Sequence, residues 1–136
     1  MKNKKNSLTK KLDDLASKVV RLRDKGICTL CLKKFDLNKL NAHHWIVTKA
    51  HSKKHRWNIK NLLSLCFACH LYKIHSTASL KYIDQLKKNA ISLGIVTEKD
   101  IEEIERDNEI ADFSTGELEE LVKSFQKTLK KLEEQC

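Results

Sequence analysis

The sequence predicts an α+β protein that is mostly helical, and three observations lead to this fold class. The 136 residues include no proline and only three glycines, which argues against a sheet protein with many turns. Apolar residues recur at helical spacing in both terminal parts of the chain. The middle of the chain has short, irregular patterns around two Cys-x-x-Cys pairs, as expected for a small core that a bound metal would stabilise.

The length predicts one domain, which the patterns divide into three parts, and the first part is residues 1–25. Its opening "MKNKKN", residues 1–6, is interpreted as a disordered basic arm. A helix is expected over residues 8–24, and Gly26 should end it. The helix is indicated by apolar residues at helical spacing: Leu8, Leu12, Leu15, Val19 and Leu22.

The middle part, residues 26–93, combines short elements of different kinds. The segment "NAHHWIV", residues 41–47, is strand-like and leads into a basic loop at residues 48–57. After the second Cys-x-x-Cys pair, helix is expected over residues 70–75 and 78–93. The sheet of the α+β fold should therefore lie in this middle part.

The last part, residues 94–136, is acidic and is expected to be helical. One helix is expected over residues 97–107, and a capping box of Ser114 and Glu117 predicts the start of another. One face of that last helix is apolar. We expect this face to pack on the rest of the chain or to join two copies in a homodimer, through Leu118, Leu121, Val122, Phe125, Leu129 and Leu132.

The net charge of +9 divides unevenly between the two ends of the chain. Residues 94–136 contain 13 acidic and 6 basic residues, whereas residues 1–93 contain 21 basic and 5 acidic residues. The first 93 residues therefore have a charge of +16 and the remainder a charge of −7. A basic body of this strength predicts a polyanionic partner, most simply DNA.

The chain has no secretory segment and no apolar run of membrane length, so we expect a cytoplasmic protein with no membrane partner. Thiols stay reduced in the cytoplasm, which argues for metal ligation rather than disulfides. Two Cys-x-x-Cys turns, 34 residues apart, can close a tetrahedral shell around one structural zinc ion. Cys136 has no such partner, and the predicted ligands are Cys28, Cys31, Cys66 and Cys69.

Five of the six histidines lie in residues 41–70, inside or next to the segment that the two cysteine pairs enclose. His43 and His44 are adjacent, so they point to opposite faces of a strand unless the strand ends there. His51 and His55 lie among basic residues and are interpreted as part of a loop that faces phosphates. The side chains predicted to contact DNA from this loop are Lys49, Lys53, Lys54 and Arg56.

These motifs together resemble the HNH endonucleases. The shared features are a Cys-x-x-Cys knuckle, a strand ending in His43-His44, Asn61 five residues before the second knuckle, and the Cys69-His70 pair that closes it. More narrowly, "AHHWIVTKAHSKKHRWNIKNLLSLCFACH" followed by "SLKYIDQLKK" resembles the phage recombination nucleases of the NinG (Rap) type. The resemblance covers roughly residues 26–90 and leaves both termini unexplained.

The resemblance implies a ββα-metal fold that hydrolyses phosphodiester bonds in DNA, with branched or recombining DNA as the narrower substrate class. It implies that His44 is the general base and that Asn61 holds the loop of His44. His43 and His70 would bind a catalytic Mg²⁺ or Mn²⁺ ion, with His75 and Asn41 as further candidate ligands. It also implies a bacterial or phage-infected host cell.

The alternative is a non-catalytic DNA-binding protein that a structural zinc ion stabilises. Its histidines would contact phosphates or pack in the core. A binding protein needs basic residues, but it has no need for His44, Asn61 and His70 in combination. That combination therefore favours the endonuclease.

Overall fold

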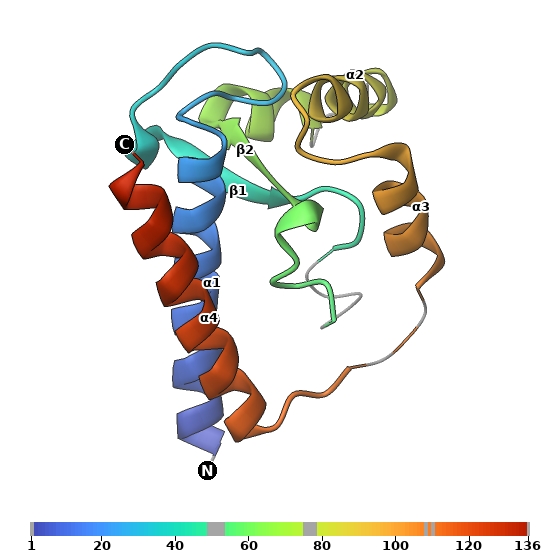
Figure 1. Cartoon of the computed structure of the whole chain (residues 1–136). Helices are drawn as coiled ribbons and strands as arrows, with labels where there is room; N and C mark the ends of the chain where they lie inside the picture. The colour runs from blue at the N-terminus through green and yellow to red at the C-terminus, as the bar shows by residue number, and fades with distance from the viewer. Residues whose placement is uncertain (1, 49–53, 75–78, 108, 110, 136) are drawn as a thin grey trace.

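The computed structural model describes residues 2–48, 54–74, 79–107, 109 and 111–135, and it contains helices with a two-stranded sheet (Figure 1). The mostly helical α+β class is therefore confirmed. The elements in chain order are α1 (Lys2–Arg23), η1 (Leu37–Lys39), β1 (Leu40–His44), η2 (Ile59–Asn61), β2 (Leu62–Cys66), η3 (Cys69–Ile74), α2 (Ser79–Ser92), α3 (Glu98–Arg106) and α4 (Thr115–Glu134).

Helix α1 begins at Lys2, so the expected disordered arm over residues 1–6 is wrong for the residues that the structure describes. The segment contains no helix breaker, and α4 lies alongside α1 in the same direction (Figure 1). An ion pair of 2.9 Å joins the Lys4 ammonium to Glu119 on α4. Packing against a partner helix, which local sequence does not reveal, thus extends the helix to the N-terminal end.

The end of α1 follows the expectation closely, because the backbone turns left-handed at Lys25 and Gly26. The Gly26 amide donates to the Arg21 carbonyl, and the Lys25 amide donates to Leu22, which satisfies two of the last helical carbonyls. A Cβ atom at Gly26 would lie 2.7 Å from the carbonyl oxygen of Phe35. Glycine is therefore required here by both the positive φ angle and the close approach of the next segment.

Strand β1 pairs with β2 in an antiparallel register that sets Leu40 opposite Cys66 and His44 opposite Leu62. All five residues of β2 are buried because the strand is covered on both faces. Leu63 and Leu65 pack in a cluster with α2 and α3, while Leu62 packs with α1 and α4. The π-helix η3 follows β2 directly, so the order is strand, strand, helix.

A buried ion pair fixes the end of α1 to β2. The Asp24 carboxylate accepts hydrogen bonds from Arg23 at 2.7 and 3.1 Å and from the Ser64 amide at 3.0 Å. The Arg23 guanidinium also donates to the carbonyls of Ile59 and Leu62. These bonds fix the strand relative to the helix that leads into the first cysteine turn.

Helix α4 begins where the Ser114 capping box predicted, and α3 begins at Glu98, close to the expected start at residue 97. Thr97 and Ser114 each form a capping box, at α3 and α4 respectively. On α4, Leu118 and Val122 are buried against α1, so the apolar face packs on the chain itself. A homodimer through this helix stays a prediction. None of the helices in the described residues combines the length and apolar character that a membrane span requires.

The Asp24 bonds can be tested by replacing the carboxylate. We expect Asp24→Asn to lower the free energy of unfolding by about 2 kcal/mol. The NH₂ group of asparagine would face N–H donors of Arg23 or Ser64 that now bond to a carboxylate oxygen, and those donors would lose their acceptor. Urea denaturation measures this loss, with the exposed Asp36→Asn as the control of equal charge change. Equal unfolding midpoints for the two variants would show that the Asp24 bonds contribute little.

Candidate functional site

The structure brings the four predicted cysteines together. The sulfur atoms of Cys28, Cys31, Cys66 and Cys69 all lie within 4.8 Å of one another. The first pair follows α1, and the second pair spans the end of β2 and the start of η3. This spacing can hold a metal ion, so the prediction that the two turns form one ligand cluster is confirmed.

The first cysteine turn is fixed by backbone and side-chain hydrogen bonds. The Leu32 amide donates to the backbone carbonyl of Cys28 at 2.8 Å, and Leu32 itself has a left-handed backbone conformation. From α2, the buried Asn89 amide donates to the carbonyls of Thr29 at 2.8 Å and Leu30 at 3.1 Å. Sequence analysis missed this role of Asn89, although a polar residue beside the apolar Ala90 was a signal for it.

The thiols differ in acidity. Burial raises the pKa of Cys28 and Cys69. Burial acts in the same direction on Cys66, but hydrogen bonds from Cys69 and the other cysteines outweigh it and lower the pKa of Cys66. A divalent cation in the cluster would bind by displacing the protons that the raised pKa values retain.

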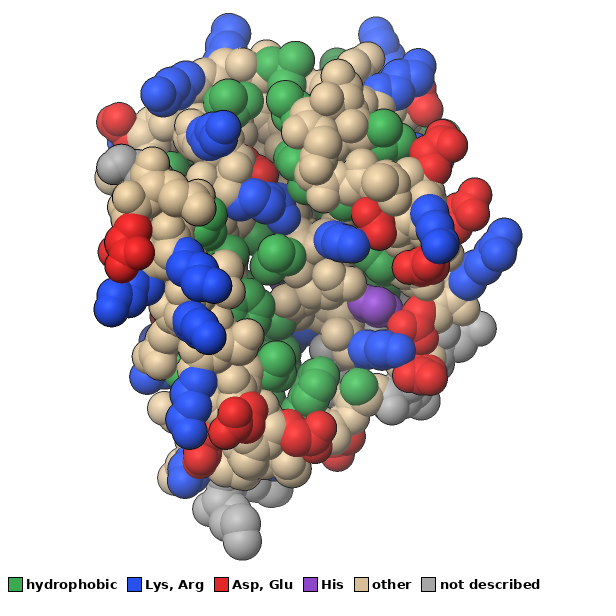
Figure 2. Space-filling model, viewed as in Figure 1, with side chains coloured by type: hydrophobic (Ala, Val, Ile, Leu, Met, Phe, Trp, Pro, Cys, Tyr) green, Lys and Arg blue, Asp and Glu red, His purple; other side chains and the backbone are tan. Residues whose placement is uncertain are grey.

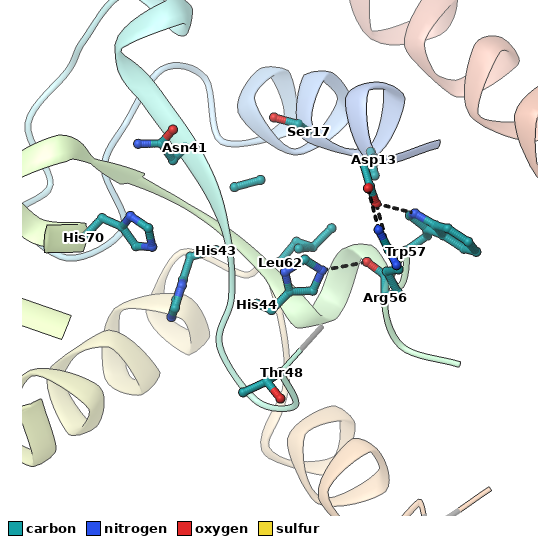
Figure 3. A pocket seen from close by; sticks show the side chains of 12 residues that line it. Asp13, Ser17, Asn41, His43, His44, Thr48, Arg56, Trp57, Leu62 and His70 are labelled. Atoms are coloured by element: carbon teal, nitrogen blue, oxygen red, sulfur yellow. Dashed lines mark hydrogen bonds and ion pairs between the residues drawn. The ribbon is translucent and has the colours of Figure 1, made fainter. Parts of the chain in front are cut away.

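The histidines predicted as catalytic or metal-binding line a cleft of about 490 Å³ between α1 and the sheet (Figure 3). Strand β1 ends at His44, so both members of the adjacent pair can border the same cleft. His75 lies outside the described residues. The polar and charged side chains of the lining are Asp13, Ser17, Asn41, His43, His44, Thr48, Arg56, Trp57 and His70.

His43 and His70 form one side of this group. Their ring centroids are 5.0 Å apart, with an angle of 63° between the ring planes. Both imidazoles are half-buried, and Asn41 borders the same cleft. Because His70 follows Cys69 directly, the cysteine cluster determines where this imidazole lies. Two imidazoles at this separation can offer nitrogen atoms to one divalent ion.

His44 lies across β1 from His43, and its orientation is set by the backbone (Figure 3). The Nε2 atom of His44 lies 2.8 Å from the carbonyl oxygen of Arg56. A carbonyl oxygen only accepts hydrogen bonds, so in the neutral ring the proton is on Nε2 and the lone pair is on Nδ1. This tautomer leaves Nδ1 as the basic nitrogen.

Asn61 is fully buried and fixes the loop that follows His44. Its side-chain oxygen accepts from the amides of Ile46 at 3.0 Å and Val47 at 2.9 Å. Its nitrogen donates to the carbonyls of Val47 at 2.8 Å and His55 at 3.2 Å. All four hydrogen-bonding positions of the side-chain amide are therefore used. The asparagine joins the two segments that flank the His44 imidazole.

The predicted DNA-binding side chains are only partly described. Lys49 and Lys53 lie outside the described residues. Lys54 forms ion pairs with Asp107 at 2.7 Å and Glu109 at 2.6 Å, and its hydrogen bond lowers the pKa of Asp107 to about 2. This region appears in Figure 2 as a mixture of acidic and basic side chains near α3. DNA contact by these lysines stays a prediction.

Two other residues of the basic loop point into the protein. Arg56 forms an ion pair with Asp13 on α1 at 2.7 Å. His55 is buried and bonded to Asp107 at 3.0 Å and to Asn58 at 3.0 Å. The interpretation of His55 as a phosphate-facing residue is therefore wrong. A half-buried carboxylate partner, Asp107, which is distant in sequence, holds the imidazole inside the protein. His51 lies outside the described residues.

Comparisons of the chain with protein-family models, with curated proteins and with solved structures find no match in any of the three. A functional conclusion therefore depends on the geometry of the cleft and of the cysteine cluster. Three histidines from β1 and η3, one asparagine that fixes their loop, and four cysteines beside them are the groups that a function has to explain.

Proposed function

We propose that this protein is a metal-dependent endonuclease of the HNH type that hydrolyses phosphodiester bonds in DNA. One observation carries the proposal: His43, His44 and His70 border a single cleft, and Asn61 fixes the loop after His44. Metal-dependent hydrolysis of a phosphodiester requires a general base next to the ligands of a divalent ion, and imidazoles can fill both roles. The order β1, β2, η3 supports the ββα-metal arrangement.

His44 is the proposed general base. The Nδ1 atom accepts a proton from the attacking water, and the Arg56 carbonyl, 2.8 Å from Nε2, stabilises the imidazolium that forms. An imidazole is suited to this role because its ordinary pKa lies near neutrality. Asn61 acts by holding the backbone after His44, at Ile46 and Val47, and the carbonyl of His55, which precedes Arg56.

His43 and His70 are the proposed ligands of a catalytic divalent ion, Mg²⁺ or Mn²⁺. The bound ion would neutralise charge at the scissile phosphate and at the leaving oxygen. Asn41 borders the same cleft and is a further candidate ligand, as is His75. The ring centroids of His43 and His70 lie 5.0 Å apart, which supports their joint assignment to one ion.

The cysteine cluster is the proposed site of a structural zinc ion. Four thiolates complete a tetrahedral shell and leave no position for a substrate or a water, so this ion does not take part in the reaction. Its proposed contribution is structural. Bound there, the ion would connect the turn after α1 to the end of β2 and would thereby set the position of His70, which follows Cys69 in the chain.

DNA is the proposed substrate because residues 1–93 have a charge of +16. The narrower resemblance to NinG-type nucleases proposes branched or recombining DNA. The charge equally favours the second candidate, a non-catalytic DNA-binding protein with structural zinc. That candidate leaves the three histidines of the cleft and the fixed tautomer of His44 without a role.

The zinc proposal predicts the effect of Cys66→Ser. We expect the purified wild type to contain one zinc ion per chain, and Cys66→Ser to lose it and to unfold the region between the two cysteine turns. Metal analysis and circular dichroism measure the two effects. Ser64 is buried in the same strand, so Ser64→Ala is the control and should retain zinc. A folded, zinc-free wild type would contradict the proposal.

The base proposal predicts the effect of His44→Ala. Strand cleavage should fall on the order of 10²- to 10⁴-fold, the usual contribution of a positioned general base. Folding, zinc content and DNA affinity should stay close to those of the wild type. Ser17→Ala, which alters the same cleft wall on α1, is the control and should retain activity. A His44→Ala variant as active as the wild type would exclude His44 as the base.

The ligand proposal predicts a different response from His70→Ala. We expect this variant to lose cleavage at low concentrations of Mg²⁺ or Mn²⁺ and to regain part of it at high concentrations, because a missing ligand weakens metal binding. Titrating the ion against cleavage rate measures the shift, with His44→Ala as the comparison that should not respond. An unchanged metal dependence in His70→Ala would remove this imidazole from the ligand set.

A further inference from the structure

The carbonyl that orients His44 belongs to a residue whose own side chain is tied to α1. The Arg56 guanidinium donates two hydrogen bonds to the Asp13 carboxylate, from Nε at 3.0 Å and from Nη2 at 2.7 Å (Figure 3). The same carboxylate accepts a bond of 2.9 Å from the Trp57 indole nitrogen. One acidic side chain thus holds two consecutive residues of the loop that carries the Arg56 carbonyl.

The bonds from Asp13 to Arg56 and Trp57 can hold the backbone of these two residues in one conformation. A bidentate pair between a guanidinium and a carboxylate sets both distance and angle, and only 19% of the Arg56 side chain and 28% of Asp13 are exposed. Trp57 is buried with Leu12 of α1 and Leu118 of α4, so its indole N–H needs a partner inside the protein. Asp13 supplies that partner.

The carbonyl of Arg56 is therefore held from both directions along the chain. Upstream, Asn61 donates to the carbonyl of His55 at 3.2 Å. Downstream, Asp13 holds the Arg56 side chain and Trp57. The carbonyl between these points faces His44 Nε2. A change at either anchor would move the acceptor that sets the tautomer of His44.

The negative charge of Asp13 is unexpected in a cleft proposed to bind DNA. The first 25 residues are strongly basic, and Asp13 is an acid that borders a cleft proposed to receive a polyanion. A carboxylate there repels phosphate, so DNA binding alone gives no reason for it. Its pairing with Arg56 offsets that repulsion, and it also keeps the guanidinium on α1.

We propose that Asp13 is a positioning residue for the general base: through Arg56 and Trp57 it fixes the carbonyl that keeps His44 protonated on Nε2. This inference rests on the proposed function for its catalytic consequence, but the geometric claim concerns the histidine tautomer alone. Asp13 does not touch the substrate. The long α1 helix, which lies outside the segment that resembles the HNH nucleases, thereby becomes part of the site.

The first test reads the tautomer without any reaction. Long-range ¹H–¹⁵N correlation spectra of the zinc-loaded, ¹⁵N-labelled chain report which ring nitrogen has the proton, and His44→Ala identifies the His44 signals. We expect His44 protonated on Nε2 in the wild type and a mixture of tautomers in Asp13→Asn. The matched control is Asp14→Asn, which removes the same charge at an exposed position one residue further along α1. An unchanged tautomer in Asp13→Asn would overturn the proposal.

Arg56→Lys provides a second variant in case Asp13→Asn does not fold. It keeps the positive charge and most of the stem but cannot form the bidentate pair. We expect the same mixture of tautomers. If Arg56→Lys folds and retains a single Nε2-protonated His44, the guanidinium–carboxylate pair is not what fixes the carbonyl, and the proposal fails.

The second test is a double-mutant cycle on single-turnover cleavage of a DNA duplex. Asp13→Asn should lower the cleavage rate on the order of 10- to 100-fold, as for residues that orient a catalytic histidine indirectly, and DNA affinity should not fall. In the His44→Ala background the same change should cost nothing further. An equal loss in both backgrounds would show that Asp13 acts elsewhere. A wild type that cleaves no DNA would overturn the proposed function, while the tautomer measurement would still decide the role of Asp13.

Discussion

The meeting of two cysteine turns is the constraint on which the rest of the structure depends. The sulfur atoms of Cys28, Cys31, Cys66 and Cys69 lie within 4.8 Å of one another, so the end of β2 is fixed beside the turn that follows α1. The antiparallel register then sets Leu40 against Cys66, and four residues later His44 against Leu62. At the other end, His70 follows Cys69 in the chain. The positions of both imidazoles are thus determined from one cluster.

Asn61 supplies the second constraint, because residues 45–48, the described part of the segment after β1, lie outside the two-stranded sheet. With two acceptor bonds and two donor bonds, the buried amide replaces the ladder that a strand would have provided. The cysteine cluster and Asn61 control different parts of the cleft. The former places His70, and the latter keeps the backbone around His44 in one conformation. Asp13 adds a third anchor from α1.

Local sequence predicted the features that depend on spacing. The convergence of the cysteines followed from two Cys-x-x-Cys turns, and the start of α4 followed from the capping box at Ser114. Gly26 ends the first helix because no other residue suits its backbone conformation and close contact. Each of these features is set within a few residues of the chain.

The features that sequence analysis missed depend on contacts between distant residues. Strand β2 reads "LLSLC", with no alternation, because α1 covers one face and the cluster with α2 covers the other. The helix at Lys2 depends on α4, more than a hundred residues away in the chain. DNA contact by Arg56 stays a prediction from its basic neighbours, but the bond of its guanidinium to Asp13, 43 residues earlier, was not predicted. No local pattern contains that partner.

The most direct test of the central claim is a plasmid assay with the zinc-loaded wild-type chain. Supercoiled plasmid and a synthetic four-way junction are incubated with the protein in buffer alone, with Mg²⁺ and with Mn²⁺. We predict nicked or linear plasmid only when a divalent ion is added, because the proposed structural zinc ion and the proposed catalytic ion would have separate roles. A folded, zinc-loaded chain that binds both DNAs and cleaves neither with either ion would contradict it.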